Sequence, residues 1–306
     1  MKLSQRNSIQ FGLGLRRENI DAIQAGLPQT LDCLEIHPEN YLGSGGPVYR
    51  QFRSLLEHYP FAYHGLSLSL GSRAPLRKDF LKKLKAFLKE VRAEWMSDHL
   101  CFATVEGFQT HDLLPLPLSR EAIRHVVPRI RQIQDYLEMP FAVENVSYYA
   151  SGGKDEMPEW EFVSEVVERA HCSLLFDVNN VYVNSVNHGF APYTYLKAVP
   201  YDRVLHVHVA GHLRYQDFLI DTHGAPIIDP VWEMLAYVAR RARPRAVIVE
   251  RDNNVPELAE SLAEVAKARE IFQAAAGMSV LAAEAPKSSL MSSAPSQERR
   301  AAGALR

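Results

Sequence analysis

The sequence contains few cysteines, no long apolar run and almost no net charge, and each absence excludes a class of protein. Its three cysteines, Cys33, Cys101 and Cys172, lie far apart in 306 residues, which argues against a disulfide framework. No stretch approaches the roughly 20 apolar residues of a membrane-spanning helix. A net charge of −2 gives no electrostatic reason to expect nucleic acid or an anionic membrane as partner. The first residues, MKLSQRNSIQFG, lack the apolar core of a signal peptide, so we expect a soluble, cytoplasmic protein.

Several nucleotide-binding and nucleophile motifs are also missing. The stretch GLGLR at 12–16 lacks the G-x-G-x-x-G spacing of a dinucleotide fingerprint. The chain has no P-loop lysine, no G-x-S-x-G elbow and no C-x-x-C pair. Cys33 and Cys172 stand at the starts of apolar runs, where small buried residues are common, and Cys101 is also expected to pack rather than react.

Eight short apolar runs alternate with amphipathic helical patterns. We predict strands at 11–16, 33–37, 61–66, 94–100, 141–146, 173–178, 203–209 and 246–251. The helical patterns cover 78–93, 120–137, 159–170, 229–242 and 255–276, with a kink or break expected at Pro128. This alternation predicts parallel β/α architecture, and the continuous apolar character of the strands is typical of a sheet buried on both faces.

The pattern favours a single domain over residues 1–276, a closed (β/α)8 barrel. Residues 277–306 are rich in Ala, Ser and Pro and have little periodicity, so we expect them to form a disordered tail.

Potential metal ligands follow six of the eight runs. The side chains at or near these strand ends are His64, His99, Glu144, Asp177, His208 and Glu250, and the loop DTHG adds Asp221 and His223. In a closed parallel barrel the strand ends meet at one rim, where such folds build their sites. Mixed imidazole and carboxylate sets suit iron, zinc or manganese.

Each residue alone also has a structural interpretation. A single His64 or His99 is more often a hydrogen-bonded core histidine than a ligand. Glu144 and Glu250 are harder to dismiss, because a carboxylate is rarely buried without a cation. The stretch DTHG is also compatible with an ordinary turn. The ordered recurrence on successive strands favours the metal site.

Strand periodicity refines two of these stretches. In HVHVAGH, alternate side chains face the same way, so His208 points inward near the mouth and His206 lies deeper behind it. His212 falls in the following loop, where it contacts either substrate or solvent. In VIVERD the same alternation places Asp252 above Glu250, near substrate, and turns Arg251 outward toward a structural ion pair.

Longer motifs connect the chain to a known family. HGLSLSLGS, SDHLCF, EN-SYY, DVNNVYVNSVNHGF, HVAGH, DTHGAPI and ER-DNN resemble the DUF692 (UPF0276) family of multinuclear non-haem iron-dependent oxidative enzymes, relatives of the methanobactin-biosynthesis oxidase. The resemblance runs from about residue 8 to about residue 272. It implies a xylose-isomerase-like TIM barrel that holds two or three irons and uses dioxygen as co-substrate.

The resemblance also implies a ligand set. It assigns one metal to His64, His99 and Glu144, a second to Glu144, Asp177, His208 and Glu250, and a third to Asn180, Asp221 and His223. Asn180 stands where endonuclease-IV-like trinuclear sites have histidine, and an amide oxygen is a weaker ligand than an imidazole. Loose or partial occupation of the third site is therefore expected.

Family members modify cysteines of ribosomally made precursor peptides, for example by forming oxazolone or thiooxazole groups or by excising a cysteine β-carbon. Many act with a partner protein that recognises the peptide and is encoded nearby. Asp252, which strand alternation places near substrate, and His212, in the loop after its strand, are the catalytic candidates. Asn184, Asn187 and His188 are candidate substrate contacts, although that loop is equally compatible with a structural role.

Two other classes of function remain open from the sequence. The same barrel supports metal-dependent sugar isomerases or epimerases and endonuclease-IV-like phosphodiesterases, although a nuclease should have a basic face. A non-catalytic scaffold or metal-storage protein is the third possibility. Neither a monomer nor a homodimer is excluded.

Overall fold

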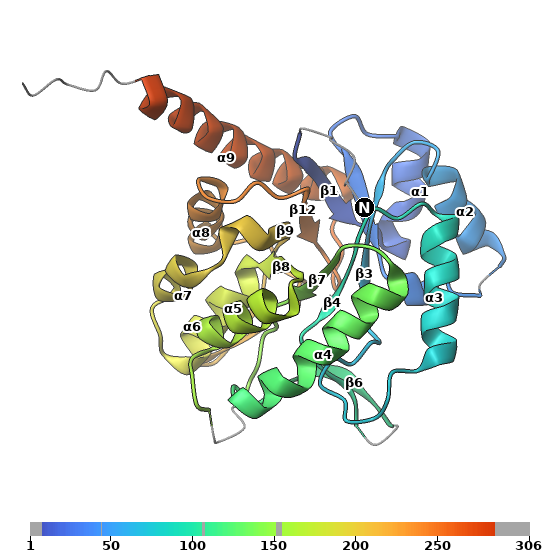
Figure 1. Cartoon of the computed structure of the whole chain (residues 1–306). Helices are drawn as coiled ribbons and strands as arrows, with labels where there is room; N and C mark the ends of the chain where they lie inside the picture. Colours follow the sequence, from blue (N-terminus) through green and yellow to red (C-terminus); the bar gives the residue numbers. More distant parts are fainter. Residues whose placement is uncertain (1–7, 44, 106–107, 151–154, 285–306) are drawn as a thin grey trace, which may run out of the picture.

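The computed structural model describes residues 8–43, 45–105, 108–150 and 155–284, and its centre is a closed barrel of eight parallel strands (Figure 1). The barrel strands are β1 (Gln10–Gly14), β2 (Cys33–Ile36), β3 (Phe61–Gly65), β4 (Met96–His99), β7 (Phe141–Glu144), β8 (Ser173–Asp177), β9 (Val204–Ala210) and β12 (Ala246–Glu250). They follow chain order around the barrel, and β1 closes it by pairing with both β2 and β12. The predicted barrel and its eight strands are confirmed.

Helices surround the barrel (Figure 1). They are α1 (Arg17–Gly26), α2 (Pro47–Leu55), α3 (Lys78–Glu90), α4 (Arg120–Leu137), α5 (Glu159–Ala170), α6 (Val178–His188), α7 (Pro192–Ala198), α8 (Asp229–Ala239) and α9 (Leu258–Glu284). The five predicted helical patterns correspond to α3, α4, α5, α8 and α9. Helix α9 continues eight residues beyond the predicted boundary at 276, and the rest of the predicted tail, 285–306, lies outside the described residues. None of the described helices combines the length and apolar character that crossing a membrane would require.

Of the kink or break expected at Pro128, a break does not occur, because α4 runs from Arg120 to Leu137 as one helix. Proline lacks an N–H, so the carbonyl of Arg124, four residues earlier, loses its helical partner. Both residues are exposed, so water can satisfy that carbonyl. The buried face of α4, with Ile123, Val126 and Ile130, then holds the helix against the barrel.

Two antiparallel hairpins extend from the C-terminal ends of barrel strands. Strands β5 (Cys101–Val105) and β6 (Phe108–Pro115) follow β4, and β10 (Leu213–Tyr215) and β11 (Phe218–Ile220) follow β9. Both hairpins therefore belong to the rim where the predicted ligands end their strands.

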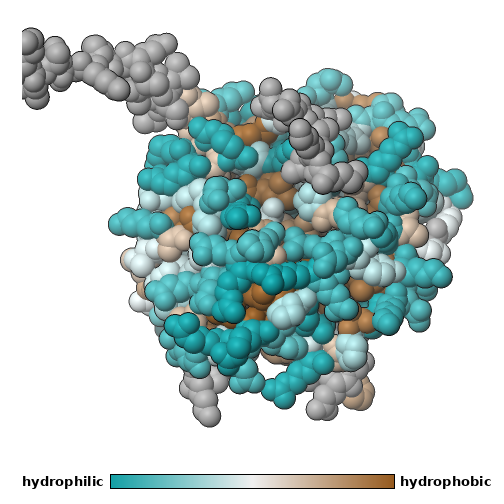
Figure 2. Space-filling view, in the orientation of Figure 1, coloured by the Kyte–Doolittle hydropathy of each residue, from teal (hydrophilic) through white to brown (hydrophobic). Residues whose placement is uncertain are grey.

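The barrel wall is tightly packed where β1 meets β2. A Cβ on Gly12 would lie 2.2 Å from the carbonyl oxygen of Cys33, so only glycine fits this position. Most barrel-strand residues are buried, whereas the molecular face in Figure 2 is covered mostly by hydrophilic residues, with hydrophobic ones visible between them. The apolar runs of the sequence therefore form the core.

The three cysteines are buried and unpaired, as expected for packing residues. Burial raises the pKa of Cys172 to about 12 and raises that of Cys101 well above its ordinary value. Both thiols therefore stay protonated at neutral pH and are poor nucleophiles. The chain's own cysteines are unsuited to reaction or metal binding.

Candidate metal centre

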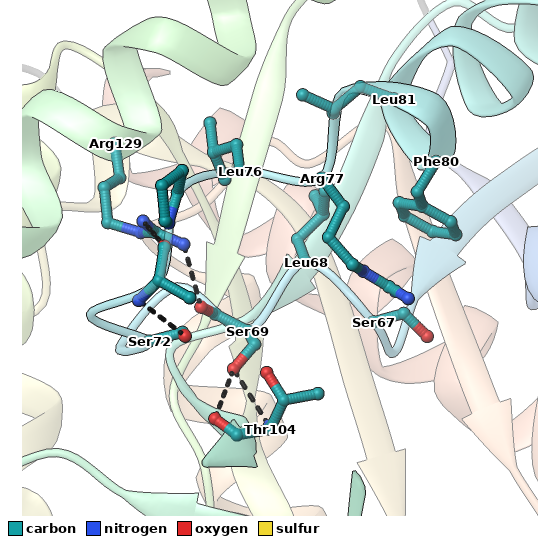
Figure 3. A pocket seen from close by; sticks show the side chains of 12 residues that line it. Ser67, Leu68, Ser69, Ser72, Leu76, Arg77, Phe80, Leu81, Thr104 and Arg129 are labelled. Carbon is teal, nitrogen blue, oxygen red and sulfur yellow. Dashed lines mark hydrogen bonds between the residues drawn. The ribbon is translucent and has the colours of Figure 1, made fainter. Parts of the chain in front are cut away.

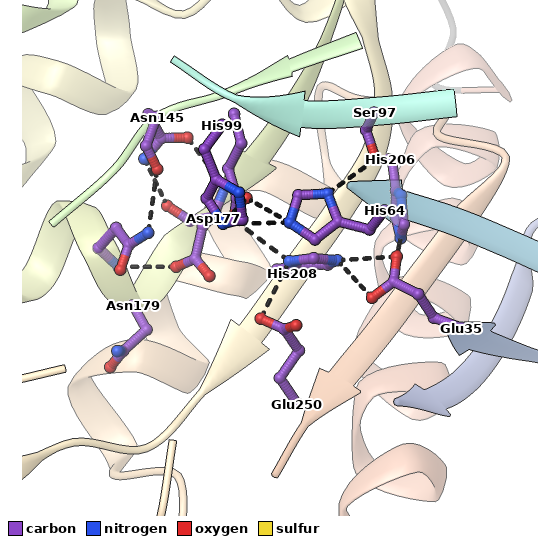
Figure 4. Close-up of polar contacts among 12 residues, drawn as sticks. Glu35, His64, Ser97, His99, Asn145, Asp177, Asn179, His206, His208 and Glu250 are labelled. Carbon is purple, nitrogen blue, oxygen red and sulfur yellow. Dashed lines mark hydrogen bonds and ion pairs between the residues drawn. The ribbon is translucent and has the colours of Figure 1, made fainter. Parts of the chain in front are cut away.

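Three neighbouring strands bring the first set of predicted ligands together. His64 near the end of β3, His99 at the end of β4 and Glu144 at the end of β7 form group one (Figure 4). The Nε2 atoms of His64 and His99 lie 2.9 and 3.0 Å from Oε2 of Glu144 and 3.1 Å from each other. All three side chains are buried.

The outer nitrogens of both histidines are fixed by the barrel wall. Nδ1 of His99 faces the carbonyl oxygen of Gly65 at 3.1 Å, and Nδ1 of His64 faces Oγ of Ser97 at 2.9 Å. A carbonyl can only accept, so His99 carries its proton on Nδ1 and its Nε2 lone pair points into group one. Burial lowers the pKa of His99 to about 3, which keeps this ring neutral. Burial opposes protonation of His64 too, but the charge of Glu144 raises the pKa of His64 to about 9.

Group two lies beside group one and shares a residue with it. It consists of Glu144, Asp177, His208 and Glu250, whose ligand atoms lie within 4.8 Å of one another. Nδ1 of His208 is 3.2 Å from Oε1 of Glu144 and 3.0 Å from Oε2 of Glu250. Glu144 thus turns one oxygen to each group, which is the arrangement of a bridging carboxylate.

Asp177 has one oxygen committed and one without a partner. Its Oδ1 caps helix α6 by accepting the N–H of Asn180 at 2.7 Å, whereas its buried Oδ2 has no hydrogen-bond partner among the residues that the structure describes. Burial, followed by the charge of Glu144, raises the pKa of Asp177 well above its ordinary value. An unpartnered buried carboxylate oxygen is costly, and a cation in group two would satisfy it.

Groups one and two fit metal ions by distance and by charge. Ligand atoms around an octahedral ion with bonds of about 2.1 Å lie about 3 Å apart, close to the separations in group one. Three carboxylates, Glu144, Asp177 and Glu250, are each at most 3% exposed, and burying each charge unpaired costs several kcal/mol. Imidazole nitrogens with carboxylate oxygens form a donor set that iron accepts.

The predicted third ligand set is only partly assembled. His223 Nε2 lies 2.8 Å from Oδ1 of Asp221, as expected, but none of the contacts of the described residues joins Asn180 to either. Asn180 donates to the carbonyl of Asn145, and its buried Oδ1 has no partner.

Group three, as the structure assembles it, comprises His223, Glu250 and Asp252. Nδ1 of His223 lies 3.4 Å from Oε2 of Glu250 and 3.0 Å from Oδ2 of Asp252. It differs from the predicted set because Glu250 and Asp252 face Nδ1 of His223, whereas Asp221 faces Nε2 on the other side of the ring and also accepts hydrogen bonds from Asn179 and Ser147.

Comparison with known proteins connects this centre to a family. The model of the family "RiPP precursor modification enzyme MbnB/TglH/ChrH" matches residues 10–273, where RiPP denotes a ribosomally synthesised and post-translationally modified peptide. A UPF0276 protein of Shewanella amazonensis is 45% identical over 266 residues, covering 87% of this chain and 95% of the relative. A UPF0276 protein of Pseudomonas aeruginosa (strain UCBPP-PA14) is 47% identical over 261 residues, covering 85% and 91%. The chain belongs to this family of precursor modification enzymes.

Solved structures similar to this member of the family support the fold alone. A D-psicose 3-epimerase, crystallised in the presence of D-fructose, superposes with a TM-score of 0.55 at 11% sequence identity. The match covers 89% of this chain and 99% of the epimerase. The xylose-isomerase-like barrel implied by the sequence resemblance is thereby confirmed.

Glu35 is a member of the centre that the sequence pattern did not single out. It is fully buried on β2, and its Oε1 and Oε2 lie 3.0 and 3.2 Å from Nε2 of His208. His206 lies deeper than His208, as predicted, with Nε2 3.4 Å from Oε2 of Glu35. Burial opposes ionisation of Glu35, but His208 and His206 outweigh it and lower its pKa.

Arg16 is a second residue that sequence reasoning missed in this family member. Its guanidinium forms an ion pair with Asp252, with Nε 2.8 Å from Oδ1, and Nη2 lies 3.9 Å from Oε1 of Glu250. A Cβ on Gly14 would lie 2.9 Å from Nη1 of Arg16, so this glycine leaves room for the arginine to fold over the mouth. Asp252 is held ionised, because His223 and Arg16 lower its pKa against the effect of burial.

The remaining predicted contacts lie around the centre. Nδ1 of His212 lies 2.8 Å from Oδ1 of Asn179, and its ring stacks on Tyr182. Burial lowers the pKa of His212. Arg251 turns away from the mouth and pairs with Glu264, with Nε 3.0 Å from Oε2, which confirms the predicted ion pair.

The candidate substrate contacts on α6 carry structural hydrogen bonds. Asn184 is fully buried; it accepts from the N–H of Tyr148 and donates to the carbonyl of Val146 and to Glu159. Asn187 donates to the carbonyl of Leu219 on β11 and accepts the N–H of the same residue. The exposed His188 stacks on Tyr148. A substrate role for Asn184, Asn187 and His188 stays a prediction, and the full commitment of the Asn184 amide does not favour it there.

Proposed function

We propose that this protein is a multinuclear non-haem iron-dependent oxidase that uses dioxygen to modify cysteine residues of a ribosomally synthesised precursor peptide. The observation that carries the proposal is the pair of fused groups, one and two, in which buried imidazoles and carboxylates converge around Glu144. Membership of the precursor modification family supplies the peptide as substrate class. The reducing cytoplasm, where the unpaired cysteines of the chain would persist, is the expected location.

In this proposal group one would hold one iron, group two a second, and His223 with Glu250, Asp252 or Asp221 a third. Bound iron would supply the one-electron chemistry that dioxygen requires and would lower the pKa of a coordinating substrate thiol. The protein's part is to hold these ligands in one protonation state and to keep water out. Burial of groups one and two would exclude water there, whereas in group three His223 is half-buried and Asp252 is exposed.

Glu35 would fix the orientation of His208. With a cation engaging Glu144 and Glu250, Glu35 would accept the Nε2 proton of His208, and the Nδ1 lone pair would point into group two. The hydrogen bond from His99 to Gly65 does the same for group one. Together they define which nitrogen of each ring meets a metal.

Arg16 and His212 would serve the substrate side of the mouth. Arg16 neutralises Asp252, which in turn orients Nδ1 of His223. The lowered pKa of Asp252 makes it a weak proton acceptor, so an orienting role suits it better than general-base catalysis. His212 remains neutral at pH 7, and its Nε2 is the candidate site for proton transfer with the peptide.

The proposal is tested on protein purified without oxygen. Iron should be bound, and dioxygen should be consumed when a cysteine-containing precursor peptide is added, with a matching mass change confined to that cysteine. Glu144→Gln should lose bound iron and turnover, whereas His58→Ala, at an exposed histidine outside the centre, should retain both. If the protein instead bound only zinc and showed phosphodiesterase turnover or ketose epimerisation, the proposal would be wrong, and a phosphodiesterase or an epimerase would take its place. A partner protein encoded nearby is expected to deliver the peptide.

A further inference from the structure

A small cavity lies beside the segment 66–76, which continues directly from β3 and group one. Its volume is about 100 Å³, and its apolar wall is formed by Leu76, Phe80 and Leu81 at the start of α3 (Figure 3). Liquid water occupies about 30 Å³ per molecule, so the cavity has room for about three waters or one carboxylate group.

Two arginines line this cavity, and neither has an acidic partner. In the described part of the chain no carboxylate lies within 4.0 Å of Arg77 or Arg129. Arg129 donates to the carbonyl oxygens of Ala74 at 2.7 Å and Ser69 at 3.4 Å, and its buried Nε has no partner. Burial lowers the pKa of Arg129. A half-buried guanidinium without a counter-ion is unfavourable, so the cavity favours an anion.

The segment that forms the cavity is held rigidly. Oγ of Ser69, a residue with a left-handed φ of 47°, accepts the N–H groups of Ala103 and Thr104 at 3.0 Å each. The N–H of Leu68 donates to Asp98 at 3.1 Å. The carbonyl oxygen of Ser69 that holds Arg129 is therefore fixed in place, and the anion site is pre-formed.

The cavity is also close to the proposed metal centre along the chain. Ser67 on its rim is three residues beyond His64, and three residues span at most about 10 Å. A peptide that places a cysteine in the barrel mouth would bring a residue about three positions away to this rim. An acidic side chain there would meet the Nε of Arg129, which has no partner among the described residues.

We propose that this cavity is a subsite for the carboxylate of an acidic residue in the precursor peptide, bound by Arg129 about three positions from the modified cysteine. The identity of the peptide rests on the proposed function. The binding of a carboxylate rests only on the cavity, so the two claims can fail separately.

The first experiment measures carboxylate binding without any peptide. N-acetyl-L-glutamate and N-acetyl-L-glutamine are titrated into the full chain, with binding followed by NMR shift changes. The acid should bind about tenfold more tightly than the amide, because a charge-assisted hydrogen bond to arginine is lost in the amide. Arg129→Met keeps the apolar stem and should abolish the preference. Arg124→Met, on the exposed face of the same helix, should retain it.

The second experiment asks whether the carboxylate comes from the peptide. Labelled hexapeptides with one cysteine, and Glu or Gln three positions before or after it, bind to the iron-loaded protein in a polarisation assay. With the variable residue either before or after the cysteine, but not in both positions, the Glu peptide should bind about tenfold more tightly than the matching Gln peptide. This difference should be seen only when Arg129 is present. A cysteine-to-serine change in the peptide should weaken Glu and Gln peptides equally.

Three results would be decisive against these claims. Equal binding of the two acetylated amino acids, or a preference that survives in Arg129→Met, overturns the subsite. The protein could instead prefer N-acetyl-L-glutamate over N-acetyl-L-glutamine and show no preference for Glu over Gln in the peptides, whether before or after the cysteine. That result would overturn the peptide as the source of the carboxylate and would point to another carboxylate-bearing molecule. A Glu preference that needs Arg129 but no cysteine supports the subsite while contradicting the proposed thiol chemistry.

Discussion

Glu35→Gln should weaken iron binding at group two while leaving group one intact. Glu35 makes two contacts with Nε2 of His208, at 3.0 and 3.2 Å, and a hydrogen bond to a charged group contributes about 1.5–3 kcal/mol. Glutamine keeps the shape and one acceptor oxygen but not the charge, so about half of this energy should be lost. A loss of about 0.8–1.5 kcal/mol corresponds to about a 4- to 13-fold lower metal affinity, at or just below the range of about 10- to 100-fold that is typical when an outer partner is lost.

The assay titrates ferrous iron into the apoprotein without oxygen, in competition with a chelator of known affinity. Mössbauer spectra of the loaded protein then separate the two iron environments. The spectrum assigned to group two should change in Glu35→Gln, and that of group one should not. Glu159→Gln is the matched control, because Glu159 is another buried glutamate whose described hydrogen bonds go to Asn184 and Tyr195. Equal affinities and identical spectra in Glu35→Gln and the native protein would refute the orienting role of Glu35.

Three further predictions concern stability. Chelator removal of bound metal should lower Tm by roughly 8–16 °C, since metal at about 1,000 times its Kd contributes about 4 kcal/mol; an unchanged melting curve would contradict a metal centre. Gly12→Ala should destabilise the chain by about 2–4 kcal/mol in urea unfolding, because its Cβ would overlap the carbonyl of Cys33, whereas Gly26→Ala, on the exposed end of α1, should be neutral or slightly stabilising. Burial raises the pKa of Glu159 to about 8, so the folded state binds the extra proton, and this contribution to stability should be present at pH 4 and lost as the pH rises to 8. Glu159→Gln should remove that decline, and equal slopes in the two proteins would contradict it.

The barrel was predictable because its strands are short, apolar and regularly spaced. The helices that escaped prediction lack that signal. Helix α6 has the sequence VNNVYVNSVNH, which is rich in poor helix formers, and its start depends on capping by Asp177 and on burial against the barrel. Helix α1 buries only Asn19, Ile20 and Ile23, too few to produce a clear apolar period.

The candidate site was predictable where a ligand ends a strand and not where it lies within one or comes from a distant segment. Glu35 sits inside the apolar stretch CLEIH rather than at its end; the alternation of strand residues, which puts Cys33, Glu35 and His37 on one face, was the available signal. The Arg16–Asp252 pair joins residues 236 positions apart, and no sequence spacing indicates such a contact. The predicted third ligand set differed because Asn180 donates to the carbonyl of Asn145, and because Glu250 and Asp252, rather than Asp221, face Nδ1 of His223.

Metal analysis of the anaerobically purified protein tests the central claim most directly. We predict two or three irons per chain, with magnetic coupling between two of them through the shared carboxylate of Glu144, and loss of that coupling in Glu144→Gln. Protein that is fully folded yet binds less than one metal ion per chain when supplied with excess ferrous iron, or irons that show no coupling, would contradict it.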